Sequence, residues 1–177
     1  MTLLKIISAA AIKEGLDVKT SELHGLSQRG GAVEAHLRFG KKVFSPLVSK
    51  GGADLIISLE TQEALVVSYY ASKKTETVIV VNQYRTPTFT ENIPDDKVLS
   101  DLKKISKEVV LVPASDICQK ELNNPVVSGI FILGLAAARS FMPLDFASLE
   151  NAMKEVVPEK YLELNLKAFN LAKNYKL

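Results

Sequence analysis

The chain has 177 residues, the size of one folded domain, and 47% of them are hydrophobic, which allows a substantial core. Its 22 basic and 20 acidic residues give a formal net charge of +2 without a dense basic face, so we expect no nucleic-acid partner. One cysteine, Cys118, and two histidines exclude an internal disulfide, a zinc site and a cysteine-ligated iron–sulfur cluster within this chain.

The N-terminal part predicts a helix followed by strands. Leu3, Ile7 and Ala11 recur at helical spacing, and Gly15 suits the end of that helix. A short strand is expected over residues 16–19, a polar connection over 20–31, and an alternating, half-buried strand over 32–39 that turns into a short strand near Val43. The N-terminus lacks a signal-peptide cleavage pattern, and the apolar run at 126–142 is too short for a bilayer span. We therefore expect a cytoplasmic chain with no membrane contact.

The rest of the chain alternates strands and helices. Apolar runs at 54–60, 77–82 and 108–113 predict buried parallel strands, joined by helices at 61–70 and 95–106. Ser115 is expected to cap a helix over 116–122, and further helices are expected over 126–141, 146–156 and 158–175. The pattern predicts one α/β domain over 1–177, a three-layer α/β/α fold with a mostly parallel sheet and a helical C-terminal tail.

Polar side chains near the strand ends have structural interpretations. Glu60 and Glu63 could form an acid pair, but we favour Thr61 as a helix cap with Glu63 near the positive end of that helix. Tyr84 and Arg85 are candidate interface anchors, since both residue types are enriched at interfaces. Cys118, on a predicted helix face, is expected to be an inert buried thiol.

The connection over 20–31 is the candidate functional segment. It places Ser21, Glu22, His24, Gln28 and Arg29 among the glycines Gly25, Gly30 and Gly31. It directly follows a predicted strand, and in open α/β sheets ligands bind beyond the carboxyl ends of parallel strands. The glycine pair would allow close approach of a ligand or a neighbouring chain.

In order and spacing, GLDVKTSELHGLSQRGG, AHLRFG and VFSPLVSKGGADLIISLE are similar to the small subunit of indolepyruvate ferredoxin oxidoreductases, within the 2-oxoacid:ferredoxin oxidoreductase family. The segment from Glu163 to Phe169 adds to the resemblance, which covers nearly the whole chain. Family members ordinarily begin with a strand and a glycine-rich turn before the first helix. The sequence from Met1 onward shows neither: the recorded start is late, the chain has been trimmed, or this variant lacks its first strand, and no ligand site is carried over from that turn.

The resemblance implies a division of labour between two subunits. A large partner would bind thiamine diphosphate, Mg²⁺ and iron–sulfur clusters, decarboxylate the 2-oxoacid, pass electrons to ferredoxin and transfer the acyl group to coenzyme A. The present chain would bind no cofactor and would close the reaction chamber against water. Alone it would be inactive, and we expect that it can self-associate.

No residue of this chain is assigned a catalytic role. The candidates for facing the active site or the partner are Ser21, His24, Gln28, Arg29, Gly30 and Gly31. Arg29 could pair with a partner carboxylate, a substrate carboxylate or a coenzyme A phosphate, because guanidinium binds such groups bidentately. It could equally tie the connection to its own sheet, and His24 could be a buried structural histidine. A second hypothesis is a stand-alone ligand-binding or scaffold module derived from this family.

Overall fold

The computed structural model describes residues 2–24, 33–86 and 93–176, which form two compact units. The first, called here the hairpin unit, comprises Met1–Val48 and Leu144–Leu162. The second, called the sheet unit, comprises Ser49–Pro143 and Glu163–Leu177. This division into two compact units does not test the prediction of a single domain, which stays a prediction.

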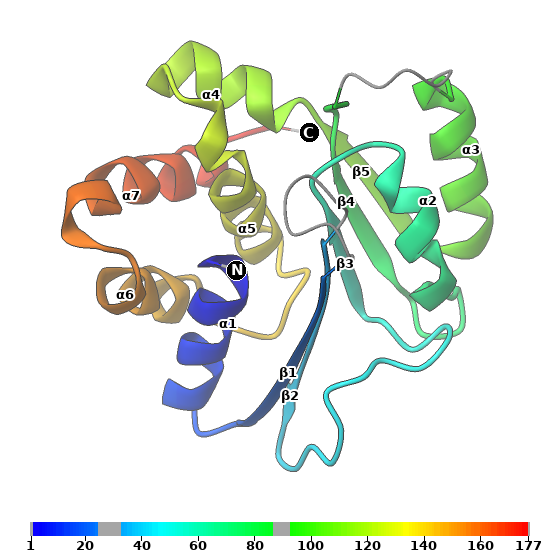
Figure 1. Cartoon of the computed structure of the whole chain (residues 1–177), viewed down its shortest axis with the longest axis horizontal. Helices are drawn as coiled ribbons and strands as arrows, with labels where there is room; N and C mark the ends of the chain where they lie inside the picture. The colour runs from blue at the N-terminus through cyan, green and yellow to red at the C-terminus, as the bar shows by residue number, and fades with distance from the viewer. Residues whose placement is uncertain (1, 25–32, 87–92, 177) are drawn as a thin grey trace. The chain divides into compact units, whose positions relative to one another are not determined.

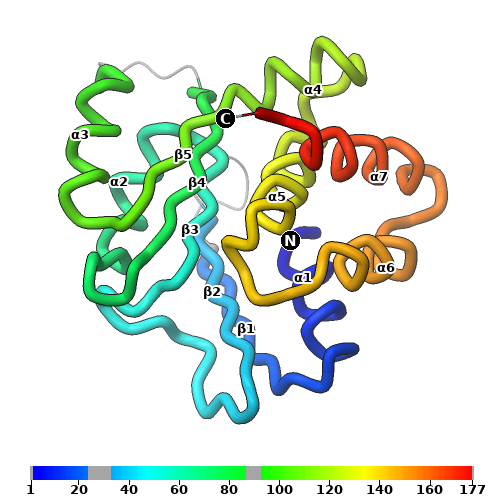
Figure 2. Tube along the Cα trace, turned by 180° about the vertical axis from the view of Figure 1, so that it is seen from behind, coloured from blue at the N-terminus to red at the C-terminus, as the bar shows by residue number. Residues whose placement is uncertain are grey.

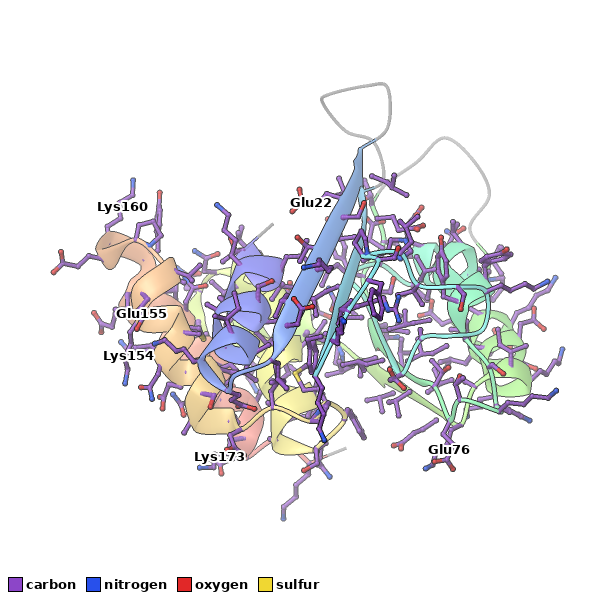
Figure 3. All side chains as sticks on the ribbon, turned by 90° about the horizontal axis from the view of Figure 1, so that it is seen from below. Glu22, Glu76, Lys154, Glu155, Lys160 and Lys173 are labelled. Carbon is purple, nitrogen blue, oxygen red and sulfur yellow. The ribbon has the colours of Figure 1, made fainter. Side chains whose placement is uncertain are left out.

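The hairpin unit contains two long antiparallel strands and two helices (Figure 1). The strands are β1 (Asp17–His24) and β2 (Val33–Gly40), paired in register from Asp17 opposite Gly40 to His24 opposite Val33. Helix α1 (Thr2–Lys13) packs against both strands and against α6 (Phe146–Val156). An ion pair joins Lys13 to Glu155, which Figure 3 marks on α6, so the N-terminal helix is held by a segment from far along the chain.

The sheet unit contains three parallel strands in the order β3 (Leu55–Ser58), β4 (Val78–Asn82) and β5 (Glu108–Val112). Helix α2 (Glu63–Val67), the 3-10 turn η1 (Ser68–Tyr70) and α3 (Asp95–Ile105) form the crossovers. Next come α4 (Ala114–Leu122), the 3-10 turn η2 (Pro125–Val127), α5 (Ser128–Ala138) and α7 (Glu159–Lys173), whose first turn is counted with the hairpin unit. Helices α2 and α3 cover one face of this sheet and α5 the other (Figures 1 and 2).

The core of the sheet unit lies between β4 and the apolar helix α5. Ile79, Val80 and Val81 are fully buried in succession, as expected for a strand covered on both faces. Helix α5 is buried along most of its length, and α7 approaches it closely at Gly134. A Cβ atom at Gly134 would lie 2.4 Å from the carbonyl oxygen of Phe169, so this helix contact requires glycine.

The predicted α/β class with parallel strands is confirmed, but several local predictions are wrong. The segment from Thr20 to His24, expected as a loop, continues β1 because β2 supplies backbone partners along its whole length. The described residues around Val43 form no strand. Ser115 lies inside α4 rather than at its cap, and Thr61 does not cap α2, which begins after Gln62 without a side-chain cap.

Candidate functional site

One face of the β1–β2 hairpin carries a row of polar side chains. Residues directly opposite each other in an antiparallel pair share a face, and register places Lys19 opposite Arg38 and Ser21 opposite His36. The sequence predicts the alternation that sets Glu34, His36 and Arg38 apart from the apolar positions of β2. It does not predict the burial of His36, whose side chain is only 5% exposed.

His36 is held by a hydrogen bond at each of its two ring nitrogens. Its Nδ1 atom lies 3.0 Å from the backbone nitrogen of Val48, which must be the donor. Its Nε2 atom lies 2.8 Å from a carboxylate oxygen of Glu34, two residues earlier on the same strand. Because Nδ1 accepts, the neutral ring carries its proton on Nε2 and donates it to Glu34.

The segment Val43–Val48, called here the covering segment, is fixed over this polar face. The Arg38 guanidinium donates to the backbone carbonyls of Ser45, at 3.1 Å, and Leu47, at 3.4 Å. An Asp17 carboxylate oxygen accepts from the backbone nitrogen of Val43 at 2.9 Å. The covering segment is therefore attached to the hairpin by side chains that contact its backbone.

Asp17 is the negative charge beneath the start of the covering segment. Its pKa is lowered below the ordinary value, first by the hydrogen bond from the Val43 backbone and then by Lys19, whose ammonium donates to it at 3.1 Å. The charged carboxylate is therefore the form that binds the segment.

Two of the predicted site residues lie on β1, Ser21 opposite His36 and His24 at the end of the strand, and the others lie outside the described residues. Ser21 is half-buried on β1, and the backbone of His24 ends that strand. Gln28, Arg29, Gly30 and Gly31 lie outside the described residues, so their assignment stays a prediction. The segment follows an antiparallel strand, so the rule for parallel carboxyl ends, used to select it, does not apply.

That rule applies instead to the sheet unit, where Asn82 ends β4. Its side-chain amide donates to the Leu59 carbonyl at 3.2 Å and to the Ser115 hydroxyl at 2.8 Å, and its Oδ1 atom accepts from the Ser115 backbone nitrogen at 3.2 Å. The Thr61 hydroxyl donates to the Asn82 backbone carbonyl. These buried groups satisfy one another at the carboxyl end of β4, the edge of an open α/β sheet at which ligands commonly bind.

Around this cluster, further polar contacts fix the connection after β4. Glu60 accepts from the backbone nitrogen and the hydroxyl of Thr86, at 3.2 and 2.7 Å. Arg85 donates to the Ile93 carbonyl at 2.7 Å and forms an ion pair with Asp95. Burial raises the pKa of Asp95, but hydrogen bonds from Arg85 and Gln83 lower it by more, so the net pKa is lowered. Arg85, expected as an interface anchor, thus has partners within the sheet unit.

Three further observations concern the Cys118 thiol, metal binding and membrane-spanning helices. Cys118 is buried, and burial raises the pKa of its thiol to about 11. Within the described residues, no group of three or more histidine, cysteine or acidic side chains is arranged to hold a metal ion. Over the same residues, no helix combines the length and apolar composition needed to cross a membrane.

Sequence reasoning overlooked His36 and Asn82 as organising residues. The signal for His36 was the alternating spacing of Glu34, His36 and Arg38, which places their side chains on one face of a strand. The signal for Asn82 was a polar residue ending an otherwise apolar buried strand. Apart from Glu34, the residues that His36 and Asn82 bind are distant in the sequence, so no local pattern identifies Val48, Leu59 or Ser115 as partners.

Comparison with known proteins gives a consistent family. The sequence model for "Pyruvate ferredoxin/flavodoxin oxidoreductase" matches residues 1–175. The indolepyruvate oxidoreductase subunit IorB of Archaeoglobus fulgidus is 34% identical over 98% of this chain and 88% of its own length. The protein of the same name from Methanothermobacter thermautotrophicus is 31% identical over 93% of this chain and 85% of its own length.

Solved structures show the same fold. The keto/oxoacid ferredoxin oxidoreductase gamma subunit of Geobacter sulfurreducens matches with a TM-score of 0.62 at 19% identity, over 97% of this chain and 88% of its own. Pyruvate oxidoreductase subunit PORC of Thermotoga maritima matches with a TM-score of 0.64 at 15% identity, over 96% and 85%.

Proposed function

Since this chain belongs to the pyruvate ferredoxin/flavodoxin oxidoreductase family, we propose that it is the small, cofactor-free subunit of an indolepyruvate-type 2-oxoacid:ferredoxin oxidoreductase. The observation that carries the proposal is the 34% identity to an indolepyruvate oxidoreductase subunit over 98% of the chain. That relative is named as a subunit, as are the gamma subunits that share the fold. The proposal therefore includes a larger partner chain that supplies the rest of the enzyme.

The proposed reaction converts a 2-oxoacid, such as an aryl pyruvate, and coenzyme A into an acyl-CoA, carbon dioxide and a proton. The two electrons released reduce ferredoxin. Thiamine diphosphate with Mg²⁺ and iron–sulfur clusters would supply this chemistry from the partner. A cluster needs several thiolates, whereas this chain has one cysteine and holds it buried as a thiol, which supports placing the clusters elsewhere.

The role proposed for this chain is to help enclose the partner's reaction site. The candidates are Ser21 and His24 on β1, and Gln28, Arg29 and the glycine pair at 30–31 in the sequence between β1 and β2. We assign Arg29 to an anionic group of the partner, the substrate or coenzyme A. An enclosed site excludes water, which protects the carbanion-like intermediates of such reactions.

The proposal is tested by co-expressing this chain with a candidate large subunit of an indolepyruvate-type oxidoreductase. We expect a stable complex that reduces ferredoxin or a viologen dye only when a 2-oxoacid and coenzyme A are present. Removing this chain should abolish or strongly reduce the rate. A large subunit that is fully active alone and forms no complex would favour a stand-alone binding module instead.

The role of Arg29 is tested in the same complex. Arg29→Ala should lower activity or assembly. Arg29→Lys should recover little of the lost activity, because a lysine ammonium cannot bind an anionic group bidentately as a guanidinium does. Arg139→Ala is a matched control, because this exposed arginine donates to the backbone carbonyl of Tyr175 inside the sheet unit. Unchanged activity and assembly in Arg29→Ala would remove Arg29 from the site.

A further inference from the structure

We infer that the covering segment is the docking surface for the large subunit, which meets it with an apolar pocket rimmed by carboxylates. This inference rests on the proposed function, because it names where the proposed partner binds. It concerns residues of the hairpin unit that the candidate site does not use, namely Phe44, Leu47 and the lysines before them.

The covering segment exposes large apolar side chains. Phe44 is 84% exposed and Leu47 is 53% exposed, although the neighbouring Val43 is buried. On the same face of the hairpin, beyond the segment, Leu23 is 52% exposed. Isolated exposed apolar residues are common, but an aromatic and an aliphatic side chain presented on one short segment are typical of interface anchors.

The backbone of this segment is fixed before any partner arrives. Asp17, His36 and Arg38 bind the backbone of residues 43, 45, 47 and 48, as described above. Within the covering segment, only backbone atoms take part in these bonds. The side chains of Phe44 and Leu47 therefore remain exposed to solvent. A segment fixed in this way loses little conformational entropy on binding, which favours a specific interface over a random exposed loop.

The charge around the segment indicates the chemistry of the partner. Residues 35–48 contain Arg38, Lys41 and Lys42 but no aspartate or glutamate, and the nearby Asp17 carboxylate is already paired with Lys19 and with the backbone of Val43. Lys41 and Lys42 are exposed, and the Lys42 ammonium lies 4.9 Å from the centroid of the Phe44 ring. An apolar anchor bordered by positive charge is complemented by an apolar pocket bordered by carboxylates.

The same charge argues against a second copy of this chain as the occupant. In a two-fold dimer each patch meets itself, so Lys41 and Lys42 of one copy would approach those of the other. Like charges brought together in a partly dry interface oppose association. A different chain with an acidic rim does not meet this repulsion.

The test compares matched pairs of residues in the complex with the co-expressed large subunit. Phe44→Ala with Leu47→Ala, and separately Lys42→Glu, should each weaken binding at least tenfold in a surface-binding assay, with circular dichroism unchanged. The control is Lys160 with Tyr161, where an exposed ammonium lies 4.6 Å from the centroid of a half-exposed ring. Lys160→Glu, at the residue labelled in Figure 3, and Tyr161→Ala should leave binding unchanged; both residues lie at the start of α7.

The outcomes separate this inference from the proposed function. If the unaltered chain binds the large subunit and the Phe44 and Leu47 double variant binds as tightly, the inference is wrong while the proposed function stands. If the double variant keeps that binding but abolishes self-association in sedimentation, the surface joins copies of this chain and the inference is also wrong. If the unaltered chain binds no large subunit, the proposed function fails, and the inference fails with it.

Discussion

The imidazole of His36 accepts a hydrogen bond from the backbone nitrogen of Val48, a residue twelve positions further along the chain. The ring thereby fixes the end of the covering segment, while Glu34 accepts a hydrogen bond from the other ring nitrogen. A buried histidine that accepts from main chain acts as a structural connector between a strand and a loop.

Replacing His36 by alanine should loosen the covering segment. The backbone nitrogen of Val48 would lose its acceptor, and a partly buried unsatisfied group costs about 1–3 kcal/mol. We expect the free energy of unfolding in urea to fall by about that amount. Lys19→Ala, an exposed change on the same face, should stay within about 0.5 kcal/mol of the parent, and equal losses for both variants would contradict the assignment.

Asp17 should titrate below its ordinary value of 3.8 in the folded chain. Because its folded pKa lies below its unfolded pKa, the charged carboxylate stabilises the fold above the unfolded pKa. That contribution disappears as the pH falls through the folded pKa. Carbon-detected NMR of the carboxyl group measures this directly. Lys19→Ala should raise the pKa only in part, since the larger cause is the Val43 backbone, and a full return to 3.8 would reverse that order.

Asn82→Ala should destabilise the sheet unit strongly. It removes a buried amide that binds the Leu59 carbonyl and both the backbone nitrogen and the hydroxyl of Ser115, and we expect a loss of about 2–4 kcal/mol. Ser115→Ala removes only the hydroxyl, and should cost about 1 kcal/mol because the amide keeps its bond to Leu59. Urea denaturation of both variants checks the ranking, which a larger loss for Ser115→Ala would refute.

Gly134→Ala should force α5 and α7 apart. The added methyl group would lie 2.4 Å from the Phe169 carbonyl oxygen and 3.1 Å from the Cβ atom of Ala172, and overpacking of this kind costs about 1–3 kcal/mol. Gly40→Ala is the control, because its new methyl group would meet nothing within 4 Å. The midpoint of thermal unfolding should be lower for Gly134→Ala than for Gly40→Ala. Equal midpoints would show that α5 and α7 accommodate the added methyl group without loss of stability.

Cys118 should resist alkylation in the native chain. A pKa of about 11 leaves about one thiol in a thousand ionised at pH 8, against about one in ten for an ordinary value of 9.0. Thiol-reactive dyes should therefore label the folded chain slowly at pH 8 and the denatured chain quickly. Rapid, complete labelling without loss of structure would show that the thiol is accessible.

The sequence predicted elements with strong internal periodicity. Helix α3 follows the prediction within one residue, since Val98, Leu102 and Ile105 mark one helical face. The buried strand β4 also follows its prediction closely, because an uninterrupted apolar run of that length suits a strand covered on both sides. These features depend only on neighbouring residues.

Features decided by distant partners were missed. The polar residues Thr20 to His24 form strand because β2 pairs with them, although their own composition suggested a loop. Val43 has a strand-forming side chain, but its backbone nitrogen binds Asp17, 26 residues earlier, instead of a neighbouring strand. Thr61 suited a helix cap locally, yet its hydroxyl donates to Asn82. A single sequence indicates the local preference of each segment for helix, strand or loop. It does not indicate which residues distant in the sequence will contact one another.

The hairpin unit is assembled from both halves of the chain, which sets an order on its synthesis. Helix α1 packs against α6, Lys13 pairs with Glu155, and the Glu14 carboxylate accepts from the backbone nitrogen of Asp145. When the ribosome has completed β1, β2 and the covering segment, the helix that must cover α1 has yet to be translated. The strands and crossovers of the sheet unit emerge in between, so the surface inferred to dock the large subunit belongs to a unit that stays incomplete while most of the sheet unit is translated.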